Sequence, residues 1–216
     1  MNYIYVKFKR LVFNSSFRIF ILLSRYKLLI KFSWLTKCII YFVRFGYGNL
    51  PWTAREDYIF NLIKFETKVD NSIIELGSGL TTLILSAITK KDFLSLENNY
   101  EFFLNTQKYL KKFKLDESNL RYSQLKDYGD FEWYNISKLK IPNRLDLIIC
   151  DGPPSTTKGG RLGIIKILNL LSVGGFIIMD DANRKGEQKV IKYIKKNFKE
   201  YKSFNLDKST VLLKKT

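Results

Sequence analysis

Short apolar runs alternate with longer amphipathic stretches from residue 70 to the C terminus. The runs are rich in Ile, Leu and Phe and are bounded by Gly, Pro, Asp and Asn, which is typical of buried strands. The predicted strands are Ser72–Leu76, Asp92–Glu97, Leu120–Ser123, Leu145–Cys150 and Gly175–Asp180. The predicted helices between them are Thr81–Thr89, Asn99–Lys114, Lys158–Leu171 and Gly186–Lys196. This alternation predicts an α/β fold, Rossmann-like and doubly wound, with a mostly parallel sheet covered on both faces.

The C-terminal segment predicts a change of strand direction. Tyr201–Leu206 and Thr210–Lys214 are separated by the turn residues 207–209, so we expect an antiparallel hairpin that completes the sheet. Ligands of such sheets bind at the carboxyl ends of the strands, near the point where the strand order reverses. The residues that follow each strand are therefore the candidates for function.

The chain is predicted to have two parts: a basic, amphipathic helical arm of residues 1–48 and a domain of residues 49–216. The longest uninterrupted apolar runs, Ile19–Ser24 and Cys38–Val43, fall far short of the ~18–20 residues that span a bilayer. No secretory signal pattern is present either, so we expect a cytoplasmic protein. No acidic residue precedes Glu56, whereas ten residues before it are basic: Lys7, Lys9, Arg10, Arg18, Arg25, Lys27, Lys31, Lys37, Arg44 and Arg55.

The arm allows three interpretations. A helix in a membrane interface would direct lysines toward anionic headgroups and apolar rings into the acyl boundary, at the inner face of the membrane. A helical cap would pack on the main domain or on a second copy in a homodimer, and a nucleic-acid arm is the third. On one continuous helix, Arg18 and Arg25 share a face and Lys27 and Lys31 lie opposite, so no single polar stripe decides among them.

The arm ends in a turn-rich stretch at residues 46–51, the predicted domain boundary. Thr53 and Glu56 have the spacing of a capping box, which predicts the start of the next helix. Its apolar residues follow at helical spacing: Tyr58, Ile59, Leu62, Ile63 and Phe65.

Composition narrows the chemistry. The chain of 216 residues has no histidine, which excludes a Ser-His-Asp triad, a histidine metal cluster and a histidine base. Its two cysteines, Cys38 and Cys150, cannot form a disulfide framework or a four-thiolate zinc site. The net charge of +17 is compatible with nucleic acid, anionic lipid or acidic glycans as binding partners. Any catalysis must use carboxylates, lysines, tyrosines, backbone groups or a cofactor.

A glycine turn follows the first predicted strand. Gly77 and Gly79 allow a tight bend and close approach of a ligand to the backbone. A dinucleotide fingerprint would have a third glycine at position 82, where Thr82 stands, so NAD is disfavoured. A mononucleoside such as S-adenosylmethionine has no pyrophosphate and is compatible with Thr82. Glu97, which ends the second strand, can accept hydrogen bonds from both ribose hydroxyls.

Carboxylates follow two further strands. Asp151 comes after the fourth strand, before a rigid Gly-Pro-Pro loop, and Asp180 and Asp181 come after the fifth. We expect the three acids to meet on one rim, where their repulsion must be offset by a metal, a cation or a proton.

The region from Pro51 to the C terminus resembles the class I S-adenosylmethionine-dependent methyltransferases. The resemblance is strongest to a bacterial subgroup with Pro-Trp, Glu-Leu-Gly-Ser-Gly, Asp-Gly-Pro and Asp-Asp-x-x-Arg motifs. These motifs stand here at Pro51-Trp52, Glu75–Gly79, Asp151–Pro154 and Asp180–Arg184, with Arg161 between the last two. The resemblance does not extend to the arm.

The resemblance implies a role for each matching position. The residues that line the methionine portion of the cofactor would be Glu75, Gly77, Ser78, Gly79 and Thr81, and Asp151 is a further predicted cofactor-binding residue. Glu97 would hold the ribose, with Asn98 beside it, and Ser123 would flank the adenine; the aspartate of many relatives is absent there unless Asp127 replaces it. Related O-methyltransferases hold a divalent metal with acids after the fourth and fifth strands. Asp151, Asp180 and Asp181 match that layout and imply a Mg²⁺ site, although Asn usually stands where Asp181 does.

The predicted reaction is in-line methyl transfer to oxygen, with a carbohydrate, glycan or other small molecule as acceptor. Without histidine, Asp151 would act as base unless a metal acidifies the hydroxyl, with Asp180 and Arg161 as the other catalytic residues. Arg161 and Arg184 would bind an anionic acceptor such as a uronic acid or phosphate. Ion pairs with the same aspartates are the alternative for both. An RNA methyltransferase and an inactive nucleoside-binding module also remain open, whereas a flipped DNA base would need an aromatic residue that the Asp151 loop lacks.

Overall fold

The computed structural model describes residues 3–25, 27–48 and 53–216. A seven-stranded sheet runs in the order β3-β2-β1-β6-β7-β9-β8. Its strands are β1 (Ser72–Leu76), β2 (Asp92–Glu97), β3 (Leu120–Tyr122), β6 (Leu145–Cys150), β7 (Leu171–Met179), β8 (Tyr201–Asn205) and β9 (Val211–Lys215). The first five are parallel, whereas β9 pairs antiparallel with both β7 and β8. The predicted fold class and the antiparallel hairpin are confirmed.

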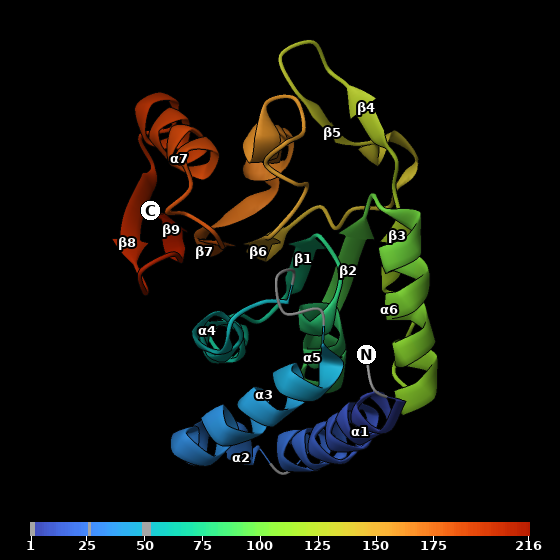
Figure 1. Ribbon diagram of the computed structural model, residues 1–216. Coiled ribbons are helices and arrows are strands. Elements are labelled where there is room, and N and C mark those ends of the chain that lie inside the picture. The colour runs from blue at the N-terminus through green and yellow to red at the C-terminus, as the bar shows by residue number, and fades with distance from the viewer. Residues whose placement is uncertain (1–2, 26, 49–52) are drawn as a thin grey trace.

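Helices cover both faces of the sheet (Figure 1). On one face lie α4 (Glu56–Glu66), α5 (Leu80–Ile88) and α6 (Tyr100–Phe113). On the other lie η2 (Gly160–Leu170) and α7 (Lys185–Asn197). Neighbouring strand residues alternate between the two cores, so Ile73 belongs to the first and Ile74 to the second. Because both faces are covered, the residues of β1 and β6 are buried throughout rather than at alternate positions.

Three features differ from the sequence prediction. Residues 160–170 form a 3₁₀ helix and not an α-helix, and the strand after them begins at Leu171. A small hairpin of β4 (Leu125–Asp127) and β5 (Glu132–Tyr134), followed by the short helix η1 (Ile136–Lys138), lies outside the main sheet. The predicted capping box is wrong: Arg55 is the N-cap of α4, and the Thr53 hydroxyl donates to the Gly48 carbonyl at 2.7 Å. The Pro51-Trp52 motif lies outside the described residues.

The N-terminal residues form α1 (Tyr3–Arg25), α2 (Leu28–Lys31) and α3 (Ser33–Tyr47), a further layer over α4–α6 (Figure 1). Phe13 and Phe17 of α1 are buried, and both rings contact Phe113 of α6. Gly46 lies against the backbone of Phe13, where a side chain would collide, so α1 and α3 pack closely. The cap interpretation of the arm therefore holds for its inner face. Within the described ranges, no helix is sufficiently long and apolar to span a bilayer.

Candidate functional site

The turn after β1 is bonded to the end of β2. The backbone N–H and the hydroxyl of Ser78 both donate to Glu97 Oε2, at 2.8 and 2.9 Å. The other carboxylate oxygen accepts the N–H of Asn99 at 2.7 Å. Glu97 is 4% exposed, so its side chain lies within the carboxyl edge of the sheet and not in bulk solvent. The structure thus brings the predicted ribose-binding acid against the predicted glycine turn.

The same turn contacts the loop after β6. Gly77 has φ +92°, and a Cβ there would lie 3.0 Å from the backbone nitrogen of Gly152. The Asp151 N–H donates to the Leu76 carbonyl at 2.9 Å. Glycine is required at position 77 for two reasons, its left-handed backbone and the close approach of a neighbouring backbone. The two loops at the carboxyl edge are therefore held in fixed relative positions.

Glu75 is a buried acid beneath the turn. Its Oε2 accepts hydrogen bonds from Thr82 and Ser95 hydroxyls, each at 2.6 Å, while Oε1 has no well-formed partner among the described residues. Burial raises the pKa of Glu75 to about 7, although the Ser95 hydrogen bond opposes the shift. Thr82, which replaces the third glycine of a dinucleotide fingerprint, thus bonds this carboxyl.

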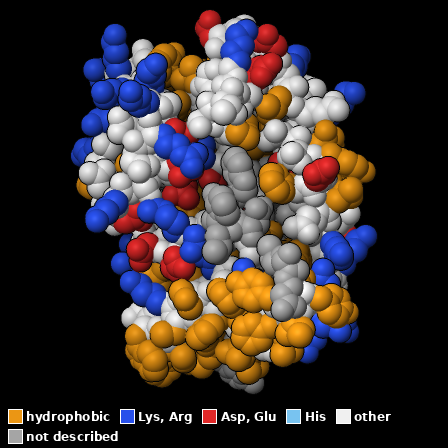
Figure 2. All heavy atoms as spheres, viewed as in Figure 1, with side chains coloured by type: hydrophobic (Ala, Val, Ile, Leu, Met, Phe, Trp, Pro, Cys, Tyr) orange, Lys and Arg blue, Asp and Glu red, His pale blue; other side chains and the backbone are white. Residues whose placement is uncertain are grey.

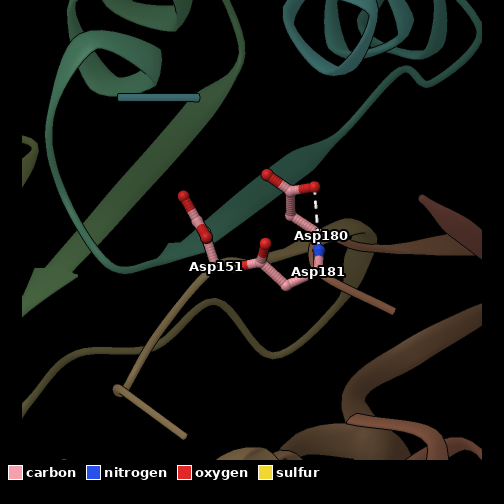
Figure 3. Close-up of side chains that lie close together, drawn as sticks. All are labelled: Asp151, Asp180 and Asp181. Carbon is pink, nitrogen blue, oxygen red and sulfur yellow. Dashed lines mark hydrogen bonds between the residues drawn. The ribbon is translucent and has the colours of Figure 1, made fainter. Parts of the chain in front are cut away.

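Asp151, Asp180 and Asp181 meet on one rim, as predicted (Figure 3). One carboxylate oxygen from each lies within 4.8 Å of the others, and the Asp181 N–H donates to Asp180 Oδ1 at 2.8 Å. Burial raises the pKa of Asp151 above its usual value; the Arg161 guanidinium opposes this shift and the Asp180 charge adds to it. Burial likewise raises the pKa of Asp180. These acids hold protons at higher pH than exposed aspartates do.

Arg161 lies beneath this rim and is 2% exposed. It donates to three backbone carbonyls, those of Cys150, Asp151 and Asp180, at 2.6–3.2 Å. It also pairs with the Asp151 and Asp181 carboxylates at 3.3 and 3.4 Å. The ion-pair alternative is therefore present for Arg161, which joins the loops after β6 and β7. Its predicted contact with an acceptor stays a prediction.

Two further arginines reach the rim. Arg184 pairs with Asp181 at 3.0 Å, and Arg55 lies 3.6 Å from Asp180. Carboxylates are the ligands that Mg²⁺ prefers, so the donor type fits the predicted metal. Each carboxylate already has a guanidinium partner, however, and a cation between them would compete with those ion pairs. Because arginines supply the compensating charge, the arrangement does not fit a resident metal, and we derive no step through one.

The remaining predicted residues lie around Glu97. Ser123 is buried, and its N–H donates to the Glu97 carbonyl at 2.8 Å, so the end of β3 adjoins the end of β2. Asn98 is partly buried after β2, and Thr81 is buried in the first turn of α5. Asp127 lies in the exposed β4–β5 hairpin and pairs with Lys158 at 3.2 Å. A role for Asp127 beside the adenine stays a prediction.

Sequence reasoning missed two tyrosines at this edge. Tyr47, at the end of α3, has its hydroxyl 4.0 Å from the position of a Cβ on Gly79. Burial raises the pKa of Tyr47, and the charges of Tyr109 and Glu97 add to the shift. Tyr58 of α4 is fully buried, and its hydroxyl has no hydrogen-bond partner among the residues that the structure describes. Burial, then the Asp151 and Asp180 charges, raise its pKa. Neither residue belongs to a motif, so only the tertiary structure reveals their position.

Solved structures share this architecture. The O-methyltransferase NovP is 13% identical with a TM-score of 0.55, over 74% of this chain and 80% of its own. An O-methyltransferase from Bacillus cereus, solved with SAH, is 12% identical with a TM-score of 0.56 and the same coverage. A Clostridium thermocellum protein provisionally described as an rRNA methylase is 16% identical with a TM-score of 0.51, covering 76% of this chain and 100% of its own.

The chain has a methyltransferase fold. At these identities the likeness concerns the fold, and it extends to enzymes with different acceptors. The sequence matches no family model and no curated protein.

Proposed function

We propose that this protein is an S-adenosylmethionine-dependent methyltransferase that acts on an oxygen of a carbohydrate, a glycan or another small acceptor. The observation that supports it most is the contact between Glu97 and Ser78 at the carboxyl edge of the sheet. Asp151, Asp180 and Asp181 lie at the same edge. A nucleoside site and an acid-rich acceptor site would then adjoin each other.

The residues of the turn suit the cofactor. A carboxylate oxygen can accept about two hydrogen bonds. Glu97 Oε1 accepts one, from Asn99, and so retains capacity for a ribose hydroxyl. Glu75, with one oxygen lacking a well-formed partner, would attract the methionine ammonium group when ionised. When bound, the cofactor supplies an electrophilic methyl group on sulfur.

Proton removal would depend on Asp151. Methyl transfer gains most of its rate from alignment and exclusion of water, and a hydroxyl acceptor must also lose its proton. The raised pKa of Asp151 makes this carboxylate a stronger base than an exposed aspartate. Arg161 would keep its orientation through the ion pair at 3.3 Å. Arg161 is thus proposed as a positioning residue rather than an acceptor ligand.

Arg184 is the arginine better placed for an anionic acceptor. Its side chain is 49% exposed, against 2% for Arg161, and it pairs with Asp181 at the surface of the rim. A uronic acid or phosphate group could exchange with that exposed ion pair at low cost. The buried Arg161 has no such freedom.

A thermal-unfolding panel tests the cofactor class before any acceptor is known. We expect S-adenosylhomocysteine to raise the melting temperature, because a ligand at 100 times its Kd stabilises the folded state by about 2.7 kcal/mol. NAD and ATP, with or without Mg²⁺, should leave it unchanged. A shift with NAD or ATP and none with S-adenosylhomocysteine would contradict the proposal.

RNA methylation is the second candidate, favoured by the net charge of +17. Incubation with radiolabelled S-adenosylmethionine and either total RNA or lipid-linked oligosaccharides separates the two acceptors. Label in the oligosaccharide supports the first proposal, and label in RNA alone replaces it with the second. Cofactor binding without transfer to either class would favour the inactive binding module.

A further inference from the structure

Helix α1 has two apolar stripes on opposite faces. The inner stripe, which packs on the core, is Phe13, Phe17 and Phe20. The outer stripe recurs at helical spacing and consists of Phe8, Leu11, Ile19 and Leu22, each 49–64% exposed. Burial of the inner stripe explains the cap, but it leaves the outer stripe without a structural role in the described chain.

The outer face of α3 continues this surface. Trp34 is 69% exposed and Tyr41 is 55% exposed, and they lie two turns apart on the side opposite the buried Val43. Phe32, between α2 and α3, is also exposed. Figure 2 shows hydrophobic side chains gathered at the end of the molecule that α1–α3 cover. We call this surface the outer arm face: the outer stripe of α1 together with Phe32, Trp34, Tyr41 and Phe42. Soluble monomers rarely expose so large a continuous apolar patch without a partner.

The charged residues around the outer arm face are all basic. Arg18 and Arg25 border the outer stripe of α1 on one side. Lys27 has a left-handed backbone and separates α1 from α2, so Lys27 and Lys31 do not continue the α1 face as one helix would predict. None of these four residues forms an ion pair with another described residue. Residues 3–48 include no acid, so the surface is both apolar and strongly basic.

A basic groove adjoins the outer stripe. It has a volume of about 290 Å³ and lies between α1 and the end of α6. Its walls are Arg18, Ile21, Leu22, Arg25, Lys112, Phe113 and Lys114. Four cations with an apolar floor suit a phosphate group that is attached to a hydrocarbon. Burial and the nearby charges of Arg10, Arg18 and Lys108 lower the pKa of Lys112, so an anion here would relieve repulsion.

We propose that the outer arm face docks on an anionic phospholipid membrane, with a lipid phosphate seated in the groove between α1 and α6. Aromatic and aliphatic side chains flanked by Lys and Arg are the surface that an interfacial amphipathic helix presents to such a membrane. A second copy fits less well, because self-association would bring two sets of unpaired cations together. RNA would contact the cations but leave the apolar centre without a partner. This proposal does not depend on the methyltransferase proposal.

Co-sedimentation of the full chain with vesicles tests this docking surface. Vesicles of phosphatidylcholine alone are compared with vesicles that contain phosphatidylglycerol. We expect strong pelleting only with the anionic vesicles, and less of it as salt rises. Equal pelleting on both, or none on either, overturns the proposal.

Matched variants locate the surface. Arg18→Glu with Arg25→Glu should weaken binding to anionic vesicles at least tenfold. Lys189→Glu with Lys192→Glu on α7 changes the net charge equally and should not. The double variant Leu11→Ser with Trp34→Ser should reduce binding severalfold. Val173 lies in β7, away from the outer arm face, and is 77% exposed, so Val173→Ser should not reduce binding. All these positions are exposed, and circular dichroism verifies folding.

Two results would replace the membrane with another occupant. A dimer that Leu11→Ser with Trp34→Ser dissociates, without vesicle binding in the wild type, would assign the outer arm face to a second copy. Tight RNA binding that Arg18→Glu with Arg25→Glu abolishes, again without vesicle binding, would assign it to nucleic acid. Either result overturns the proposal.

Discussion

Glu97 and Ser78 join the ends of β1 and β2 through two hydrogen bonds to one carboxylate oxygen. Ser78 follows β1 and Glu97 ends β2. The two residues meet because β1 and β2 are adjacent and parallel, which places the carboxyl ends of both strands at the same edge. It keeps the carboxylate at the carboxyl edge, where a nucleoside would bind. The remaining features of the site are arranged around this pair.

The first prediction concerns the glycine turn. Gly77→Ala should lower the free energy of unfolding more than Gly174→Ala does, measured by urea denaturation. Both glycines have a left-handed backbone, at φ +92° and +83°, and this alone costs about 1–2 kcal/mol for alanine. Only at Gly77 would the new Cβ meet a backbone atom, the Gly152 nitrogen at 3.0 Å. Equal losses for the two variants would show that the β1 and β6 loops do not constrain each other.

The second prediction concerns the buried carboxyl of Glu75. Its pKa of about 7 in the folded state exceeds the value of 4.5 expected when unfolded. Between these pH values only the folded state holds the proton, so stability is greatest below pH 4.5 and falls as pH rises toward 7. Relative to wild type, Glu75→Gln should therefore gain on the order of 3 kcal/mol between pH 4.5 and 8.

Urea denaturation across that pH range measures the difference between wild type and variant. The exposed Glu101→Gln variant serves as the control and should show no such gain. A stability difference between wild type and Glu75→Gln that does not vary with pH would show that Glu75 titrates as an ordinary carboxyl.

The third prediction concerns the charge of the acid cluster. Arg55, Arg161 and Arg184 offset the charges of Asp180, Asp151 and Asp181, so neither Mg²⁺ nor a chelator should shift the melting temperature by more than a degree. A shift of several degrees with millimolar Mg²⁺ that Asp181→Asn abolishes would establish a metal site instead.

The fourth prediction separates the two apolar faces of α1. Phe17 is fully buried against α6, so Phe17→Ala should lower the free energy of unfolding by about 3–5 kcal/mol. Phe8 is 53% exposed on the same helix, so Phe8→Ala should lower the free energy of unfolding by less than about 0.5 kcal/mol. Denaturation of both variants measures the difference. Two small losses would mean that α1 is not part of the folded core.

Sequence patterns predicted the central sheet well and its surroundings less well. The bounds of β1, β2 and β6 were predicted to the residue because each is a short, mostly apolar run bounded by turn-forming or charged residues. The strands of β4 and β5 have only three residues, which is too short for any periodicity to be recognised. The α1 pattern was ambiguous because apolar residues occupy both the buried and the exposed face.

The candidate site was predictable where a residue ends a strand. Glu97, Asp151 and Asp180 follow apolar runs, and topology alone places such residues on one edge. Tyr47, at the end of α3, and Arg55, which precedes α4, reach that edge from outside the resemblance motifs. Their contacts join residues far apart in the sequence. Local spacing contains no information on such contacts.

Calorimetric titration with S-adenosylhomocysteine tests the central claim most directly. Glu97→Gln removes the carboxylate charge that would strengthen the hydrogen bond from a ribose hydroxyl and should raise the Kd by about 10–100-fold. Glu101→Gln, an equivalent change on the exposed first turn of α6, should leave the Kd within twofold. An unchanged Kd for a folded Glu97→Gln variant, or no binding by the wild type, would contradict the nucleoside site at this edge.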